Sequence, residues 1–175
     1  MQNFAQHLAH PPARPFVNGL ATSAAAVPAR QPGVDFCRAT YSRQADTEFV
    51  QMLDGFRSSG GLARLREVSE LCALRGGPSI DMLATSLARK EIICVEWQSQ
   101  GWLPLFQFDP VDMTVRPQIQ PVVAELSCIY SPWDLAFWFS QPNAWLGCNI
   151  PADSLLTDLE TVVQAARADR FVASG

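Results

Sequence analysis

The chain has 175 residues, of which 48% are hydrophobic and 17% charged, and its formal net charge is −4. This length and composition predict a globular chain with one main hydrophobic core, and they exclude collagen-like, coiled-coil and wholly disordered proteins. The net charge is +2 over residues 1–46, −1 over 47–96 and −5 over 97–175. The acidic second half is therefore disfavoured as a direct contact for nucleic acid.

Residues that commonly perform catalysis or bind metals are scarce. The two histidines, His7 and His10, lie near the N-terminus, so the rest of the chain cannot supply the histidine of a Ser-His-Asp or Cys-His pair. The five cysteines are dispersed and never spaced as C-x-x-C, which predicts reduced, mostly buried thiols in the cytoplasm. We therefore expect that the chain is not an enzyme and that it has no catalytic residue, metal or cofactor. No run of 18 apolar residues occurs, so no membrane-spanning segment is predicted.

Residues 1–44 are rich in proline and alanine and show no sustained periodicity. This composition predicts a disordered N-terminal extension. The stretch from Phe16 to Arg30 is the one candidate for a secretory signal, but Asn18, Gly19 and two hydroxyl residues interrupt it. A flexible tail is the favoured interpretation.

Residues 45–90 are expected to form a helical, helix-turn-helix-like subdomain. The first helix should begin at Asp46 or Thr47, and the second and third should be separated by the glycine pair at 76–77. The expected inward-facing residues of the three helices are Phe49, Met52, Leu53 and Phe56; Leu62, Leu65, Val68, Leu71, Cys72 and Leu74; and Ile80, Leu83, Ala84 and Leu87.

The region over 91–172 is expected to begin with a two-stranded β-hairpin. Its strands are "EIICVEW" and "GWLPLFQFD", with Gly101 at or near the turn. Pro104 predicts that the second strand lies at an edge or is irregular. We expect this segment to seal the junction between two helical halves, which requires Phe106 and Phe108 to be buried.

Four further helical segments follow the hairpin. One begins near Ile119, after Pro117, and the next has Ser131 as its cap and ends before Pro142. The last two are expected in "PADSLLTD" and "LETVVQAARADRFV". The predicted fold is therefore mainly α: a multi-helix bundle with one central two-stranded hairpin and a disordered N-terminal arm.

Several short motifs occur together in the second half. They include the "FQF" of residues 106–108, a following tryptophan, a "PN-x-x-L" step, a proline at the next helix start and a final Val/Ala-rich helix. The residues that carry them are Phe106, Gln107, Phe108, Trp138, Pro142, Asn143, Leu146, Pro151, Leu155, Val162, Val163 and Ala166. In their order and spacing, residues 92–170 resemble the Xre/MbcA/ParS-like antitoxin family, specifically its toxin-binding domain.

The resemblance implies a small helical protein, expected here to be a homodimer, that binds and neutralises a cognate toxin of the RES-like, NAD-degrading or ADP-ribosylating type. It implies that the C-terminal part of the chain covers the toxin's active-site cleft. The residues assigned to partner binding on this basis are Trp145, Arg167, Asp169, Arg170 and Phe171.

The alternative function is a helix-turn-helix transcriptional regulator that dimerises through its C-terminal half. Its DNA-binding residues would be Arg64, Arg66, Arg89 and Lys90. Because seven acidic residues lie among the basic residues of 47–96, a solvated helical surface is the favoured interpretation of these positions.

Overall fold

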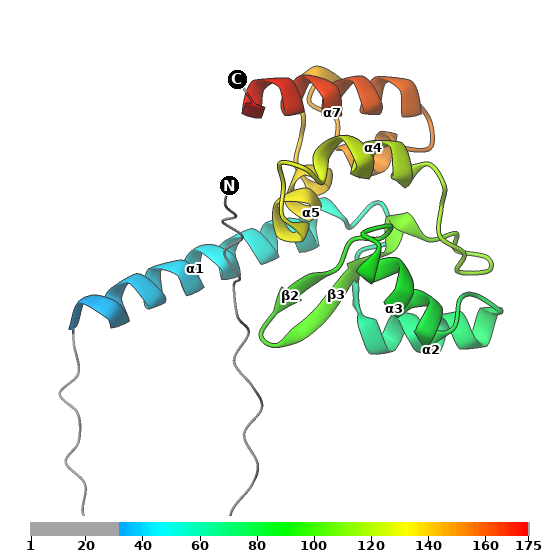
Figure 1. The fold of residues 1–175 in the computed structure, drawn as a ribbon, viewed down its shortest axis with the longest axis horizontal. Coiled ribbons are helices and arrows are strands. Elements are labelled where there is room, and N and C mark those ends of the chain that lie inside the picture. Colours follow the sequence, from blue (N-terminus) through cyan, green and yellow to red (C-terminus); the bar gives the residue numbers. More distant parts are fainter. Residues whose placement is uncertain (1–31, 175) are drawn as a thin grey trace, which may run out of the picture. The chain divides into compact units, whose positions relative to one another are not determined.

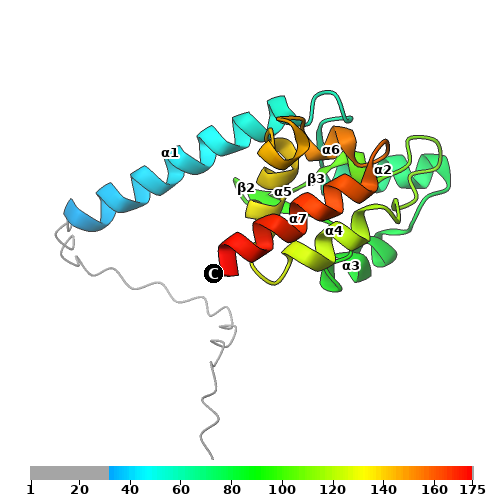
Figure 2. The same ribbon diagram turned by 90° about the horizontal axis from the view of Figure 1, so that it is seen from above.

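The computed structural model describes residues 32–174, with side chains from residue 43 onward (Figures 1 and 2). These residues form a mainly helical fold around one small antiparallel sheet, which confirms the expected fold class. The elements are α1 (Pro32–Gly55), β1 (Leu62–Arg64), α2 (Leu65–Arg75), α3 (Ile80–Ala88), β2 (Val95–Trp97), β3 (Gln100–Pro104), the 3-10 turn η1 (Leu105–Gln107), α4 (Ile119–Leu126), α5 (Pro132–Ser140), the 3-10 turn η2 (Ala144–Leu146), α6 (Pro151–Ser154) and α7 (Leu159–Ser174).

Helix α1 begins at Pro32, so the prediction that it begins at Asp46 or Thr47 is wrong. Proline suits a first helical turn because its missing N–H would have no partner inside the helix. Residues 32–44 of the expected N-terminal extension therefore belong to α1, and residues 1–31 lie outside the described residues. Of the predicted inward stripe, three members are buried but Leu53 is 40% exposed.

The sheet has three strands in the order β1-β3-β2, which corrects the expected two-stranded hairpin. The added strand is β1, whose Leu62 pairs with Pro104 and whose Arg64 pairs with Trp102. Helix α2 begins at Leu65, so Leu62, which was expected on the inward stripe of this helix, belongs to β1. A three-residue strand is too short to show an alternating pattern, so sequence periodicity could not separate it from the helix that follows.

The turn between β2 and β3 lies at Gln98 and Ser99, which both have positive φ angles, as in the primed turns that suit hairpins. Gly101 is inside β3 and pairs with Glu96, so it lies near the turn, as the sequence allows, but not at it. A Cβ atom at Gly101 would lie 3.1 Å from Cys94 Sγ, so the glycine permits close packing. β3 is the central strand, not an edge, and Pro104 is its last residue.

The three side chains of the "FQF" segment lie in different parts of the core. Phe106 lies in η1 and packs against Phe56 and Phe139, with ring centroids 5.5 and 4.9 Å away. Phe108 belongs to a second hydrophobic cluster together with Met113. Phe106 is 6% exposed and Phe108 2%, which confirms the expected burial at this junction. The expected strand instead ends at Pro104 and is followed by the 3-10 turn.

Gln107 lies between these two phenylalanines and is completely buried. Its Oε1 accepts a hydrogen bond from the Ile93 N–H at 2.8 Å, and its Nε2 donates to the Ile93 carbonyl at 2.9 Å. The amide side chain thus pairs with an extended segment as a neighbouring strand would, and it leaves neither polar atom unpaired.

The larger hydrophobic cluster is formed by α1, β2, η1 and the helices α4 to α7. Helices α4 and α7 pack side by side in both views (Figures 1 and 2). The expected starts of α4 at Ile119 and of α5 at Pro132 are confirmed, and Ser131 and Asp134 form a capping box on α5. In α7, four residues are buried: Val162, Val163, Ala165 and Ala166.

The smaller cluster lies under α2 and α3 and buries Val68, Cys72 and Leu83 from these helices. Three predicted inward residues are instead exposed: Leu74, Ile80 and Ala84. β1 from the expected 45–90 subdomain pairs with β3 from the 91–172 region, so the two segments share one sheet. In the described part of the chain, no helix is both long and apolar enough to cross a membrane.

Candidate functional site

A network of hydrogen bonds centres on the Asp169 carboxylate, on the C-terminal helix α7. Trp138 Nε1 in α5 donates to Oδ2 at 2.7 Å, Asn143 Nδ2 donates to the same oxygen at 2.9 Å, and Trp145 Nε1 donates to Oδ1 at 3.1 Å. One carboxylate thus accepts from three side chains of two other elements. Hydrogen bonds to an ionised acceptor are stronger than neutral ones, so this node holds α5 and η2 against α7.

Asn143 is the residue that organises the loop into this position. It caps η2, and its Oδ1 accepts a hydrogen bond from the Trp145 N–H at 2.8 Å while its Nδ2 binds Asp169. The turn closes at Gly147, whose φ of 62° lies in the left-handed region that glycine adopts most readily. The backbone and the indole N–H of Trp145 are therefore both anchored.

Two large apolar side chains of the C-terminal region are exposed. The Trp145 side chain is 59% exposed although its N–H is bonded, and Phe171, two residues after Asp169, is 80% exposed. Trp138 and Asn143 also line a shallow hollow of about 320 Å³, which contains the hydroxyl-bearing Tyr130. Burial, followed by the negative charges of Asp169 and Asp134, raises the pKa of Tyr130.

A second charged cluster joins α4 to α7. Arg167 Nε donates to Glu125 Oε1 at 2.9 Å, and Arg170 Nη1 lies 2.6 Å from Oε2 as an ion pair without hydrogen-bond geometry. The hydrogen bond from Arg167 outweighs the partial burial of Glu125 and lowers the pKa of this carboxyl. The same bond raises the pKa of Arg167. The side chains of both arginines remain about half exposed.

The structure places the five predicted partner-binding residues in three groups. Trp145 and Asp169 bond to each other, Arg167 and Arg170 share Glu125, and Phe171 is exposed. Sequence reasoning missed Glu125 altogether. It noted Trp138 and Asn143 only as family features, because nothing in their spacing shows that they converge on a residue of the last helix.

The four residues predicted to contact DNA are mostly paired with nearby acids. Arg64 lies 3.3 Å from Glu67 and its guanidinium stacks on Trp102 at 4.9 Å from the ring centroid. Two further ion pairs are exposed, Arg66 with Glu70 at 3.7 Å and Arg89 with Glu91 at 3.8 Å.

Lys90 directly follows Arg89 after the end of α3 and is exposed. Helix α3 itself contains Asp81 and no basic residue. The four basic residues therefore lie outside α3, at the start of α2 and beyond the end of α3, so no basic side chain projects from the helix that would read DNA.

Groups for metal or thiol chemistry are sparse in the described residues. No cluster of three or more His, Cys, Asp or Glu side chains there could hold a metal ion. Burial raises the pKa of Cys72 and Cys94, which disfavours the reactive thiolate. Of the four cysteines whose side chains the structure describes, Cys72 is buried, Cys94 is half-buried, and Cys128 and Cys148 are exposed. The prediction of mostly buried thiols is therefore wrong for these four, and the side chain of Cys37 lies outside the described residues.

Comparison with known proteins adds no assignment. No protein-family model matches the chain, and no significantly similar curated protein or solved structure was found.

Proposed function

We propose that the chain is a non-enzymatic binding protein of the antitoxin type, whose C-terminal helical region binds and neutralises a partner toxin. The proposed partner is a RES-like, NAD-degrading or ADP-ribosylating protein in the cytoplasm. The proposal is supported by the motif resemblance over residues 92–170 and by two exposed features of the C-terminal region. One is Trp145 with the Asp169 network, which we call the C-terminal surface, and the other is Phe171 on α7.

The observation that carries the proposal is the anchored but exposed indole of Trp145. Tryptophan is enriched among the residues that contribute most to protein–protein affinity. A side chain that is already held in one orientation loses less conformational entropy when a partner covers it. Here Asp169 and Asn143 hold Trp145 while 59% of its surface remains open to solvent.

The arginines of α7 suit the same role. Arg167 and Arg170 are held by Glu125, yet about half of each side chain is accessible. Guanidinium groups can bind carboxylates or phosphates in a planar, bidentate manner. A toxin cleft that carries such groups would compete with Glu125 for the two arginines, which predicts binding that weakens as salt concentration rises.

Co-expression with the protein encoded by the neighbouring gene tests this function. We expect a complex in pull-down and rescue of growth, and we expect Trp145→Ala and Phe171→Ala each to weaken the complex by at least tenfold. Leu74→Ala is the matched control, because Leu74 is exposed on α2 away from the C-terminal surface. Absence of a complex and of growth rescue, or equal loss from all three variants, would contradict the proposal.

Asp169 is assigned as a positioning residue for Trp145. Asp169→Asn keeps the shape but removes the charge that accepts the three hydrogen bonds. We expect weaker toxin binding, together with altered tryptophan fluorescence. In a double-mutant cycle, the effect of Asp169→Asn should shrink when Trp145 is already alanine. Additive effects in the cycle would rule out the positioning role.

A transcriptional regulator remains the second candidate. The feature that favours it is the pair α2 and α3, which are joined by a four-residue break as in helix-turn-helix units. Titration onto the promoter of its own operon at two salt concentrations distinguishes the candidates. Affinity that falls with salt would support DNA binding, since phosphate contacts release counterions.

A further inference from the structure

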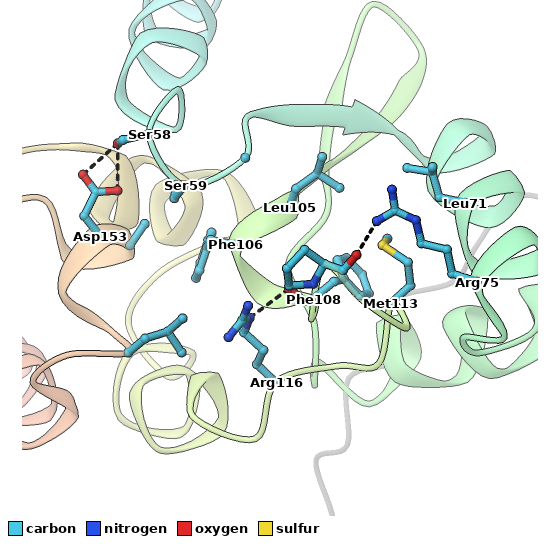
Figure 3. Close-up of a pocket in the computed structure, with 14 residues that line it drawn as sticks. Ser58, Ser59, Leu71, Arg75, Leu105, Phe106, Phe108, Met113, Arg116 and Asp153 are labelled. Atoms are coloured by element: carbon cyan, nitrogen blue, oxygen red, sulfur yellow. Dashed lines mark hydrogen bonds between the residues drawn. The ribbon is translucent and has the colours of Figure 1, made fainter.

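We propose that a cavity between α2, η1 and α6 binds a small amphipathic molecule with an apolar body and a single anionic group. Figure 3 shows this cavity, which has a volume of about 660 Å³. That size falls within the range of small-molecule sites, roughly 300–1,000 Å³. None of the residues of the C-terminal surface lines it, so this proposal stands apart from toxin binding.

The walls of the cavity are mainly apolar and come from both hydrophobic clusters. Phe106 belongs to the larger cluster, whereas Phe108 and Met113 belong to the smaller one. Leu71 of α2 and the exposed Leu156, which follows α6, extend the apolar lining. The two clusters meet here without closing on each other, and an apolar ligand would bury the surface that both leave open.

Two guanidinium groups form the cationic part of the lining. Arg75, at the end of α2, donates through Nη1 to the Pro110 carbonyl, and Arg116 Nε donates to the Phe108 carbonyl at 2.8 Å. Figure 3 shows both side chains reaching the backbone around Phe108 from different sides. Because their acceptors are two residues apart, the two arginines are positioned by the same short turn.

Each arginine has spare hydrogen-bonding capacity. A guanidinium group carries five N–H donors, and each of these two uses one of them in a hydrogen bond to the turn. In the described part of the chain, no carboxylate lies within 4.0 Å of Arg75. Arg116 has only a long ion pair, 3.9 Å from Asp109, and its side chain is mostly buried. Of the two arginines, Arg75 therefore offers a ligand anion the positive charge that no carboxylate already neutralises.

The acidic part of the lining lies elsewhere. Asp153 of α6 is on the far side of the cavity in Figure 3, where Ser58 Oγ lies 2.8 Å from both of its carboxylate oxygens. The cavity thus has an arginine side and an aspartate side separated by apolar walls. This polarity favours a molecule whose anionic group lies at the turn that follows Phe108 and whose apolar body extends along Phe106.

Calorimetric titration of the full-length protein with decanoate tests the site, with decylammonium as the matched probe of opposite charge. We expect saturable binding of decanoate at one site per chain. Decylammonium should bind at least about tenfold more weakly, which corresponds to about 1.4 kcal/mol. Absence of saturable decanoate binding, or equal affinity for the two probes, would overturn the proposal.

Three variants locate the site. Arg75→Gln should weaken decanoate binding by about tenfold or more, the magnitude of one charge-assisted hydrogen bond. Leu156→Trp should narrow the cavity at its exposed rim and weaken the binding of decanoate. Arg66→Gln is the control, because Arg66 is an exposed arginine of α2 outside the cavity.

The variants must first show wild-type thermal unfolding, and both cavity positions are accessible enough to tolerate substitution. Loss of affinity in Arg75→Gln and Leu156→Trp with an unchanged Arg66→Gln supports the proposal. Unchanged affinity in both cavity variants would place decanoate elsewhere and contradict it, and the arginines would then serve only to hold the turn.

Discussion

The C-terminal helices and the α2–α3 region use charged residues in different ways. In the C-terminal region, the hydrogen bonds of Asp169 reach residues 24 to 31 positions away in the chain, and Glu125 bonds to Arg167 across 42 positions. In the α2–α3 region, the ion pairs join neighbours such as Arg66 and Glu70. Long-range bonds connect elements that are distant in the chain and position their side chains, whereas pairs of near neighbours stabilise only local structure.

The two hydrophobic clusters also differ in how many elements of the fold they join. The larger cluster is built from α1, β2, η1 and all four C-terminal helices, and it contains most of the aromatic packing. The smaller cluster buries one residue of α3, Leu83, and leaves Ile80 and Met82 exposed. We therefore expect the α2–α3 region to tolerate substitution better than the junction and the C-terminal helices, and four changes test that contrast.

The largest effect is expected from Phe106→Ala at the junction. Removing a buried phenylalanine that packs against Phe56 and Phe139 should lower the free energy of unfolding by about 3–5 kcal/mol. Urea unfolding followed by circular dichroism measures this. Val111→Ala, at an exposed position, should leave the midpoint nearly unchanged. Similar midpoints for the two variants would show that the packing of Phe106 at the junction does not stabilise the fold.

The next effect is expected from Gln107→Leu. The substitution keeps the approximate volume but leaves the buried N–H and carbonyl of Ile93 without partners, at a cost of about 2–4 kcal/mol for the two groups. Gln51→Leu, on the exposed face of α1, is the control. The same urea titration measures this cost. A loss of unfolding free energy no greater than that of the control would mean that the Ile93 N–H and carbonyl find other partners.

A smaller, pH-dependent effect is expected from Glu125→Gln. The pKa of Glu125 is lowered in the folded chain, so its carboxylate stabilises the fold above the ordinary pKa near 4.5, and this contribution disappears as pH falls through the folded-state pKa. Wild type should exceed the variant in stability near neutral pH, and the difference should vanish in acid. Thermal unfolding across pH measures it, and a constant difference would exclude the ion pairs as its source.

The smallest effect is expected from Arg66→Gln. Its ion pair with Glu70 is exposed, spans one helical turn and is open to screening by salt. No measurable shift in the urea midpoint is expected at physiological salt. A clear loss of stability there would break the contrast between local and long-range charge pairs.

Much of the local structure could be predicted from the sequence. The starts of α4 and α5 follow from a proline and from a serine cap, and the burial of Phe49, Met52 and Phe56 follows from their helical spacing. Local signals of this kind depend on a few adjacent residues, which the sequence displays directly. The exposure of Leu74 and Ile80 could not be predicted, because helical spacing does not say how much of a helix a neighbouring element covers.

The candidate site shows the same division. A resemblance in sequence pointed to Trp145, Asp169 and Phe171, but it assigned all of them to direct partner contact. The structure adds that Asp169 accepts the hydrogen bond that holds Trp145, which the sequence did not show. It also joins Glu125 to the two arginines, and no spacing rule connects residues 42 positions apart.

By itself the sequence determined the mainly helical class, the Ser131 cap of α5 and most of the inward stripes, because these depend on backbone geometry within a few residues. Only the tertiary structure decided that Leu62–Arg64 completes the sheet, that Phe106 and Phe108 enter different clusters and that three donors converge on Asp169. Each of these features depends on groups far apart in the chain, whose pairing becomes favourable only when the surrounding elements have already packed.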